Sequence, residues 1–214
     1  MTVLGCWHLY SKCGYVHRDV SINNVVLVED ASIESNGMLI DFDMAVKYSE
    51  QRSGAVERTG TFYFMAVGIL TGTALVHTPL DDLESFLYIL LYLGTCYANG
   101  KVRVINHQEQ YLFRPPTRSA YCLAACGVLK LGWMAKQIFQ GTVLGGLDDA
   151  FRKRLGKLLV RLRDILWHTC LLTHRDPSPS PELRVTSPMP TPTSTSLRIR
   201  CMTRFLKKYS SRHL

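Results

Sequence analysis

The chain has 214 residues, of which 47% are hydrophobic and 10% aromatic, and a formal net charge of +8 at pH 7. This length and composition suit one globular domain with an appendage and exclude a wholly disordered chain. Residues 1–150 hold 11 Lys and Arg against 14 Asp and Glu, whereas residues 151–214 hold 14 against 3. The basic character therefore belongs to the C-terminal third.

The seven cysteines are scattered, and no two of them form a C-x-x-C pair. This pattern favours a reduced intracellular protein over a disulfide framework or a zinc site. The N-terminus lacks the apolar core of a signal peptide, and the longest apolar run, 86–98, is too short to span a bilayer. We expect an intracellular protein without a membrane partner, and leave open whether it is cytoplasmic or nuclear.

Helical patterns cover four stretches: residues 2–13, about 80–98, 118–140 and 148–172. Pro79 precedes the second stretch, for which Asp81 or Asp82 is the expected cap. Two short apolar strands, 24–28 and 38–40, flank a turn signal and predict a β-hairpin. The predicted fold is therefore mainly α with one short hairpin.

Two basic segments close the chain. In the helix predicted over 148–172, leucines repeat at helical spacing and Lys and Arg fill much of the remainder, which favours an outer helix with a solvated basic face. Residues 173–214 form a basic tail rich in Pro, Ser and Thr, which we expect to be disordered. A solvated tail is favoured over nucleic-acid contact, since no RNA-binding aromatic motif accompanies it.

The residues His17–Asn24 carry the chemistry, because they fit the H-R-D-x-x-x-x-N pattern of a protein-kinase catalytic loop. In that pattern the Asp accepts the substrate hydroxyl proton and the Asn, five residues later, holds a Mg²⁺ ion. One loop can thus aim a carboxylate at the nucleophile and an amide oxygen at a metal that bridges ATP phosphates.

Three further segments follow in the order and at the spacings of a protein kinase. Leu39–Asp43 (LIDFD) occupies the place of the D-F-G motif, with Asp41 seventeen residues after Asn24. Arg58–Ala66 resembles the G-T-x-x-[FY]-M-A stretch that closes an activation segment. His77–Phe86 resembles the start of the kinase F helix. Four motifs in the order of a protein kinase argue against a coincidental H-R-D tripeptide.

The S-x-N-N form of the loop, LIDFD, GTFYFMA and DDLESFLYIL resemble the fungal-type protein kinase family. The resemblance runs from residue 1 to about 172 and concerns the C-terminal kinase lobe only. It implies a helical lobe with its catalytic loop at 15–28, its activation segment at 41–66 and its F helix at about 80–98. The N-terminal β lobe of a kinase is expected to be absent, and the tail 173–214 lies outside the resemblance.

The resemblance also implies the site. Asp19 is the expected catalytic base, Asn24 and Asp41 are the expected ligands of Mg²⁺ bound with ATP, and Thr61 is expected to orient Asp19. Arg18 is expected to tie the catalytic loop to the activation segment. The structural anchors are expected to be two residues, His17 and Asp82.

Departures from the family pattern bear on activity. No Gly-rich loop, V-A-I-K lysine or C-helix Glu occurs in the sequence, so we expect the chain alone to be inactive or nearly so. Ser21 stands where Ser/Thr kinases place a Lys, which leaves open whether the substrate residue is Ser, Thr or Tyr. Asp43 replaces the Gly of D-F-G. Val67-Gly68 follows Ala66 in place of Pro-Glu, so the usual ion pair that braces the activation segment cannot form there.

Three functions remain in view. The first is the catalytic half of a protein kinase, whose partner is a protein substrate or the missing N-terminal lobe. The second is a pseudokinase-like interaction module, against which the presence of Asp19, Asn24 and Asp41 argues. The third is a small-molecule phosphotransferase, against which Arg18 and the GTFYFMA segment argue.

Overall fold

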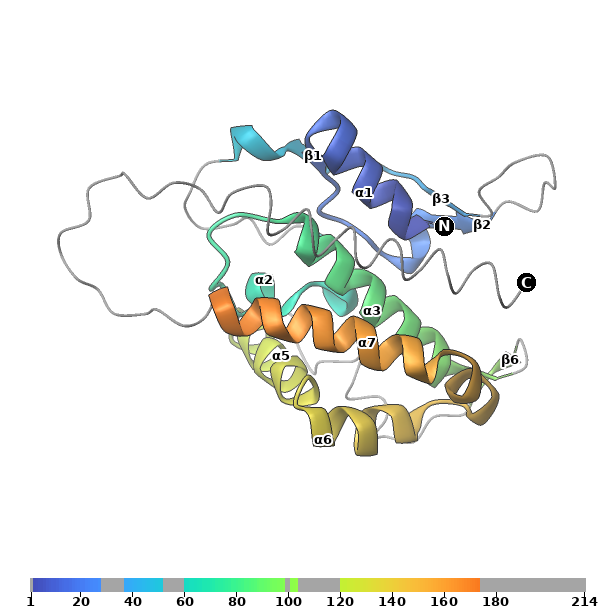
Figure 1. Cartoon of the computed structure of the whole chain (residues 1–214). Helices are drawn as coiled ribbons and strands as arrows, with labels where there is room; N and C mark the ends of the chain where they lie inside the picture. Colours follow the sequence, from blue (N-terminus) through green and yellow to red (C-terminus); the bar gives the residue numbers. More distant parts are fainter. Residues whose placement is uncertain (1, 28–36, 52–59, 99–100, 104–119, 174–214) are drawn as a thin grey trace, which may run out of the picture. The chain divides into compact units, whose positions relative to one another are not determined.

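The computed structural model describes residues 2–27, 37–51, 60–98, 101–103 and 120–173. The chain divides into two compact units, residues 1–163 and 164–214, and the fold below is that of the first unit. Its main elements are α1 (Thr2–Cys13), β1 (Tyr15–Val16), β2 (Val25–Leu27), β3 (Gly37–Leu39), β4 (Val46–Lys47), α2 (Val67–Thr71), α3 (Pro79–Cys96), β5 (Tyr97–Ala98), β6 (Lys101–Val102), α5 (Ala120–Trp133), α6 (Lys136–Ile138) and α7 (Asp149–Thr173), the last of which continues into the second unit. Figure 1 shows a mostly helical fold, and its described part contains no closed sheet.

The strands form three separate antiparallel pairs. The predicted hairpin is present as β2 and β3, with Val25 opposite Leu39. The sequence did not reveal the other two pairs, β1 with β4 and β5 with β6, because strands of two residues show no alternating pattern. The pair β1–β4 joins the residues just before the catalytic loop to those just after LIDFD. Both motifs are thereby tied at one place.

The helix α3 starts earlier than the sequence suggested. Thr78 is its N-cap and Pro79 its first residue, and the Thr78 hydroxyl and Asp81 carboxylate form a reciprocal capping box. The predicted cap at Asp81 or Asp82 is therefore wrong: Asp81 is the third helical residue, and Asp82 is buried and engaged elsewhere. Proline at the first helical position sets the start, because its missing N–H needs no partner there.

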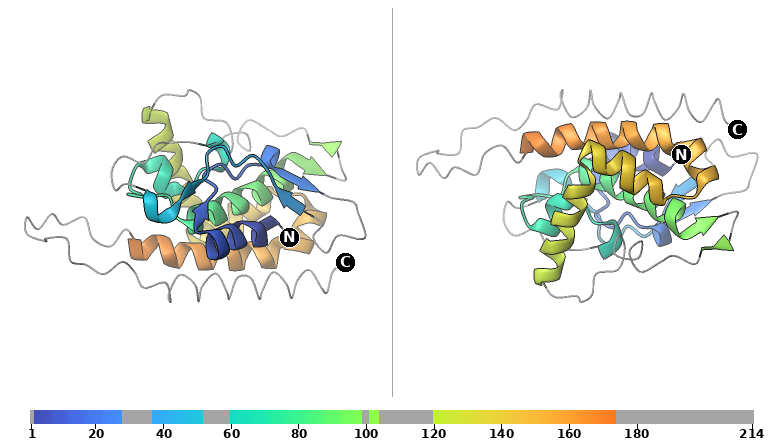
Figure 2. Two further views of the ribbon diagram at one scale, coloured as in Figure 1. Left: turned by 90° about the horizontal axis from the view of Figure 1, so that it is seen from above. Right: turned by 90° about the horizontal axis from the view of Figure 1, so that it is seen from below.

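The apolar core surrounds α3 and α2. Leu70, Leu87 and Leu159, from α2, α3 and α7, are fully buried. Helix α5 packs closely on α2, and α1 packs on α3. Figures 1 and 2 show both pairs side by side. The single helix predicted over 118–140 is interrupted, because Ala135 is extended between α5 and α6.

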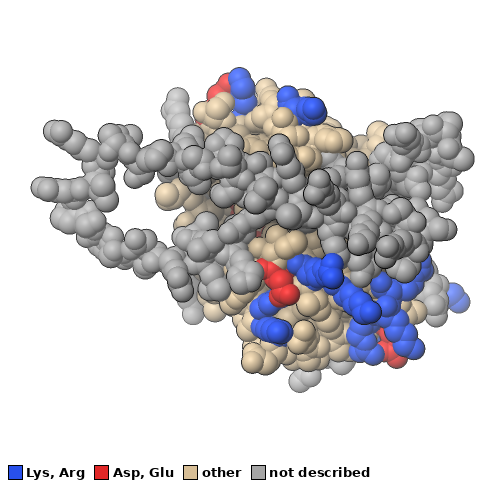
Figure 3. All heavy atoms as spheres, viewed as in Figure 1, with Lys and Arg blue, Asp and Glu red and all other residues tan. Residues whose placement is uncertain are grey.

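The exposed surface of α7 is basic. Lys153, Arg154 and Lys157 are exposed, while Leu158 and Leu159 on the same helix are buried. Figure 3 shows Lys and Arg side chains gathered over the N-terminal part of α7. This agrees with the predicted solvated basic face. Among the helices that the structure describes, none is long and apolar enough to cross a membrane. The tail 174–214 lies outside the described residues.

Candidate active site

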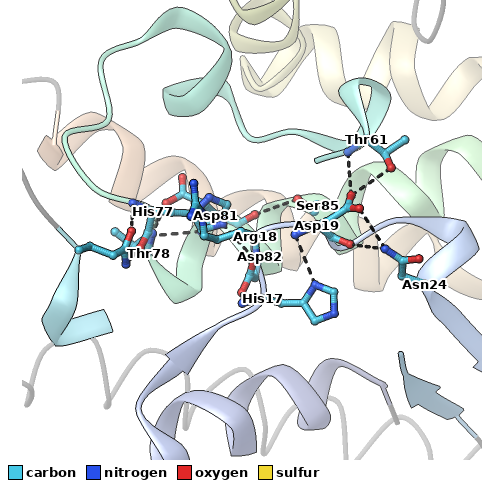
Figure 4. A network of polar contacts seen from close by, with 11 residues as sticks. His17, Arg18, Asp19, Asn24, Thr61, His77, Thr78, Asp81, Asp82 and Ser85 are labelled. Atoms are coloured by element: carbon cyan, nitrogen blue, oxygen red, sulfur yellow. Dashed lines mark hydrogen bonds and ion pairs between the residues drawn. The ribbon is translucent and has the colours of Figure 1, made fainter. Parts of the chain in front are cut away.

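The backbone of the catalytic loop is held from below by Asp82 on α3. Its Oδ2 accepts a hydrogen bond of 2.8 Å from the N–H of His17, and its Oδ1 accepts one of 3.0 Å from the N–H of Arg18. Asp82 is 2% exposed, so its charge is compensated by these groups and not by water. Figure 4 shows this carboxylate at the centre of a polar network that joins α3 to the loop.

His77 supplies the remaining partner of that carboxylate. Its Nε2 lies 2.9 Å from Oδ1 of Asp82. The side-chain amide of Gln51 donates to the His77 carbonyl at 2.8 Å and accepts from the His77 N–H at 3.0 Å. Burial lowers the pKa of His77, but the hydrogen bond and charge of Asp82, with the charge of Asp81, outweigh burial and raise the pKa above its usual value. When His77 is protonated, it forms a buried ion pair with Asp82.

Asp19, the predicted base, is fixed by two residues. Its Oδ1 accepts hydrogen bonds from the N–H and the hydroxyl of Thr61, at 2.7 and 3.0 Å. Its Oδ2 accepts one from Nδ2 of Asn24 at 3.1 Å. The structure thus brings Asp19, Asn24 and Thr61 together across 42 residues of sequence (Figure 4). Asp19 itself remains partly exposed.

Gly60 makes the contact of Thr61 with Asp19 possible. Its φ is +108°, and a Cβ added there would lie 2.7 Å from the carbonyl oxygen of Arg18. Neither the conformation nor the space admits a side chain. Glycine is therefore required where this segment crosses the catalytic loop.

The ring of His17 connects the catalytic loop to the LIDFD segment. Its Nδ1 accepts the N–H of Asp19 at 3.3 Å, so the tautomer with its proton on Nε2 donates to the carbonyl of Ile40 at 3.1 Å. The ring also meets the Phe42 ring edge-on, with centroids 5.0 Å apart. His17 is completely buried and touches the residues on both sides of Asp41.

Arg18 and Asp41 are the two residues other than glycine with positive φ in the described part of the chain, at 70° and 62°. Such conformations are costly for residues with a side chain and concentrate at functional sites. Both lie in motifs that the sequence singled out. The contacts of His17, together with a hydrogen bond from the Ile40 N–H to the Asn24 carbonyl, hold the Asp41 backbone in place.

Asn24 and Asp41 offer the ligand chemistry that Mg²⁺ prefers, which is oxygen. Asn24 uses both donors of Nδ2 toward Asp19, at 2.9 Å to the carbonyl and 3.1 Å to Oδ2. No partner for its Oδ1 is found among the described residues, so that oxygen remains to accept a cation. The carboxylate of Asp41 is exposed. These two residues therefore fit the magnesium site that the sequence indicates.

Ser21 does not take over the position of a phosphate-contacting Lys. Its side chain is 1% exposed, and its hydroxyl has no hydrogen-bond partner in the described structure. A group so deeply buried cannot reach a phosphate at the surface of the loop. The described residues also contain no cluster of three or more His, Cys, Asp and Glu side chains arranged to bind a metal.

Sequence reasoning assigned no role to His77, Glu84, Tyr88 and Lys130, all of which are buried. Glu84 lies near the start of α3, and Lys130 lies among apolar neighbours in α5. A charged residue inside an apolar helical stretch is the signal that could have pointed to Lys130. The sequence could not reveal what they contact.

Residues 2–94 match the family described as fungal protein kinase, which confirms the resemblance inferred from the motifs. The matched segment thus resembles the fungal protein kinases.

Curated proteins with similar segments carry kinase names. The chain is 37% identical over 70 residues to serine/threonine-protein kinase MST20 of Pyricularia oryzae, covering 33% of this chain and 7% of that protein. It is 28% identical over 130 residues to serine/threonine-protein kinase ste20 of Emericella nidulans, covering 61% and 13%. It is also 28% identical over 130 residues to serine/threonine-protein kinase pakA of Talaromyces marneffei, covering 61% and 17%. The chain thus spans less than a fifth of the length of these relatives.

Proposed function

We propose that this chain carries the catalytic centre of a protein kinase, which transfers the γ-phosphoryl group of ATP to a protein hydroxyl. The arrangement of Asp19 carries the proposal: Thr61 and Asn24 hold its carboxylate in one orientation on a loop anchored by Asp82. A general base must lie within hydrogen-bond reach of the proton that it takes, and a carboxylate held in one orientation and partly exposed can meet that condition.

Different residues of this chain accept the proton, hold the metal ion and position the backbone. Oδ1 of Asp19 already accepts two hydrogen bonds from Thr61, so Oδ2 is the oxygen that takes the proton of the substrate hydroxyl. Asn24 and Asp41 would hold Mg²⁺, which neutralises charge on the ATP phosphates when bound. The proton taken by Asp19 leaves to water after transfer. Asp82 and His17 keep the backbone of both motifs in place.

The substrate is proposed to be a Ser or Thr hydroxyl. The relatives named above are all called serine/threonine-protein kinases, whereas the sequence of the loop left Tyr open. The sequence contains no Gly-rich loop or V-A-I-K lysine to cover the nucleotide. We therefore propose that efficient transfer needs an ATP-clamping segment in addition to these residues, and that the chain alone transfers slowly or not at all.

The test measures the midpoint of thermal unfolding of the purified chain with ATP, with and without Mg²⁺. Stabilisation that needs both, and that is lost in Asp41→Asn but kept in Asp19→Asn, is expected. The control variant Asp149→Asn changes an exposed carboxylate on α7 and is expected to behave as the original chain. If millimolar Mg²⁺ and ATP stabilise none of the proteins, or stabilise Asp41→Asn equally, the proposal fails.

A further inference from the structure

The backbone of residues 63–67 has irregular geometry and needs outside partners for its polar groups. It leads from a short 3₁₀ helix, Phe62–Phe64, through Met65 and Ala66, which are extended, into α2. The carbonyls of Tyr63 and Met65 and the N–H of Val67 are all bound by side chains from other helices. Backbone groups buried in this way must be paired.

Lys130 of α5 binds the two carbonyls. Its Nζ donates to the Tyr63 oxygen at 2.9 Å and to the Met65 oxygen at 2.7 Å. The ammonium group lies 3.8 Å from the centroid of the Tyr88 ring, within cation–π distance. Only 3% of Lys130 is exposed, so its contacts replace water almost entirely.

Glu84 of α3 binds the N–H group. Its Oε1 accepts from Val67 N–H at 2.9 Å and from the Tyr88 hydroxyl at 2.5 Å. Tyr88 therefore contacts both charged residues, with its ring facing Lys130 and its hydroxyl bonded to Glu84. The three side chains form one buried unit, called here the clamp: Glu84, Tyr88 and Lys130.

The approach of α5 to α2 places Lys130 within reach. At Gly127, one turn before Lys130, an added Cβ would lie 2.6 Å from the Thr71 side chain and 3.0 Å from that of Leu70. Only glycine allows the two helices to come this close. Because α2 follows residues 63–67 directly, this packing brings the Lys130 side chain over that segment.

Burying the clamp costs free energy, because burial disfavours the charged forms of both Glu84 and Lys130. Burial raises the pKa of Glu84 to about 7, although the hydrogen bonds from Tyr88 and Val67 favour its charged form. Burial likewise lowers the pKa of Lys130 to about 7, against the attraction of Glu84. An apolar pair would pack here without that cost, but it could not bind three backbone groups.

We propose that Lys130 and Glu84 are positioning residues, which fix residues 63–67 and so hold Thr61 in contact with the catalytic carboxylate of Asp19. This inference rests on the proposed function, in which Asp19 is the base. The sequence has Val67-Gly68 where a kinase has the Pro-Glu whose ion pair braces the activation segment, and the clamp takes over that role with residues from α3 and α5. Thr61 lies two residues before the clamped segment, and the 3₁₀ bond from the Phe64 N–H to the Thr61 carbonyl connects the two.

The test compares amide hydrogen exchange in the whole chain and in Lys130→Met, which removes the charge and keeps most of the side-chain volume. Exchange at the Thr61 and Val67 amides is expected to rise roughly tenfold or more, because the Tyr63 and Met65 carbonyls lose their buried partner and the segment between these two amides is no longer held. Exchange at Leu87, within α3, is expected to stay unchanged. Lys136→Met, at an exposed lysine of α6, is the matched control and should change none of these amides.

A second variant covers the case in which Lys130→Met does not fold. Tyr88→Phe removes only the hydroxyl bound to Glu84 and is expected to raise exchange at Val67 selectively. If either folded variant raises exchange equally throughout the core, or leaves Thr61 and Val67 unchanged, the clamp has no positioning role. Exchange is measured without nucleotide, so this outcome is independent of whether Mg²⁺ and ATP bind. Their stabilising effect, if present, should persist in Lys130→Met, because Asn24 and Asp41 lie outside the clamp.

Discussion

Asp82 and His17 are 65 residues apart in sequence and are joined by a hydrogen bond of 2.8 Å, in which the buried carboxylate accepts the backbone N–H. The neighbouring N–H, that of Arg18, binds the other oxygen of the same carboxylate. Two successive peptide groups are thus oriented from α3, and Arg18 is held at a φ of 70° that a residue with a side chain seldom adopts. The strained turn that presents Asp19 therefore depends on Asp82.

The first prediction concerns Asp82→Asn. The neutral amide loses the ion pair with His77 and can accept only one of the two loop N–H groups through its single oxygen. Breaking a buried charged pair costs about 3–5 kcal/mol, so the free energy of unfolding should fall by about that amount. Urea denaturation measures it.

Asp149→Asn is the control for Asp82→Asn. Asp149 is exposed and pairs with Arg152 on the surface of α7. Exposed pairs contribute about 0–1 kcal/mol, so this variant should unfold nearly as the original chain does. A loss at Asp82 as small as that at Asp149 would show that the carboxylate does not hold the loop.

The second prediction concerns pH and His77. Because its pKa is raised in the folded state, pairing with Asp82 contributes stability that is fully present below about pH 6.5, the usual value. That contribution is lost as pH rises through the folded pKa. The difference in free energy of unfolding between the original chain and His77→Gln should therefore shrink from pH 6 to pH 8. A difference that is constant or grows over this range contradicts the ion pair.

The kinase-like motifs and the order of the main helices could be recognised from the sequence. The H-R-D-x-x-x-x-N spacing indicates which carboxylate and amide share a loop, and helical periodicity located α1, α3 and α7 within a few residues. Local pattern suffices for these features, since each depends on residues close together in the chain. The start of α3 was misjudged because both acidic residues resemble caps, whereas Pro79 fixes the start at Thr78.

Long-range partners could not be predicted in this way. Lys130 reaches the carbonyls of Tyr63 and Met65, more than sixty residues away, only because α5 packs on α2. A sequence pattern shows that a lysine lies in an apolar helix but not which buried oxygens it meets. The strand pair β1–β4 was missed for a related reason, because two residues carry too little pattern to indicate a partner.

The third prediction concerns Glu84→Gln. Glu84 has an ordinary pKa of 4.5, which burial raises to about 7, so the folded chain holds a proton that the unfolded chain releases between these values. The neutral form of Glu84 therefore makes a contribution to the free energy of unfolding that is fully present below pH 4.5. This contribution declines as the pH rises toward 7, by up to about 1.4 kcal/mol per pH unit. Gln keeps an acceptor oxygen and does not titrate. The variant should show a flatter profile of unfolding free energy over pH 4.5–7, and an unchanged slope would contradict burial of this carboxyl group.

The last prediction concerns Gly60→Ala, which tests how Thr61 reaches Asp19. At a φ of +108° any side chain is strained, and the new Cβ would lie 2.7 Å from the Arg18 carbonyl oxygen. Strain of this kind costs about 1–3 kcal/mol, so urea denaturation should show a loss of that size, and exchange of the Thr61 amide should accelerate. Gly132→Ala is the matched control, because Gly132 is exposed in α5 with no atom within 4 Å of a new Cβ. Alanine there should leave stability unchanged or raise it by up to about 1 kcal/mol through its helix propensity. Equal effects of the two substitutions would mean that Gly60 is not required where the segment crosses the catalytic loop.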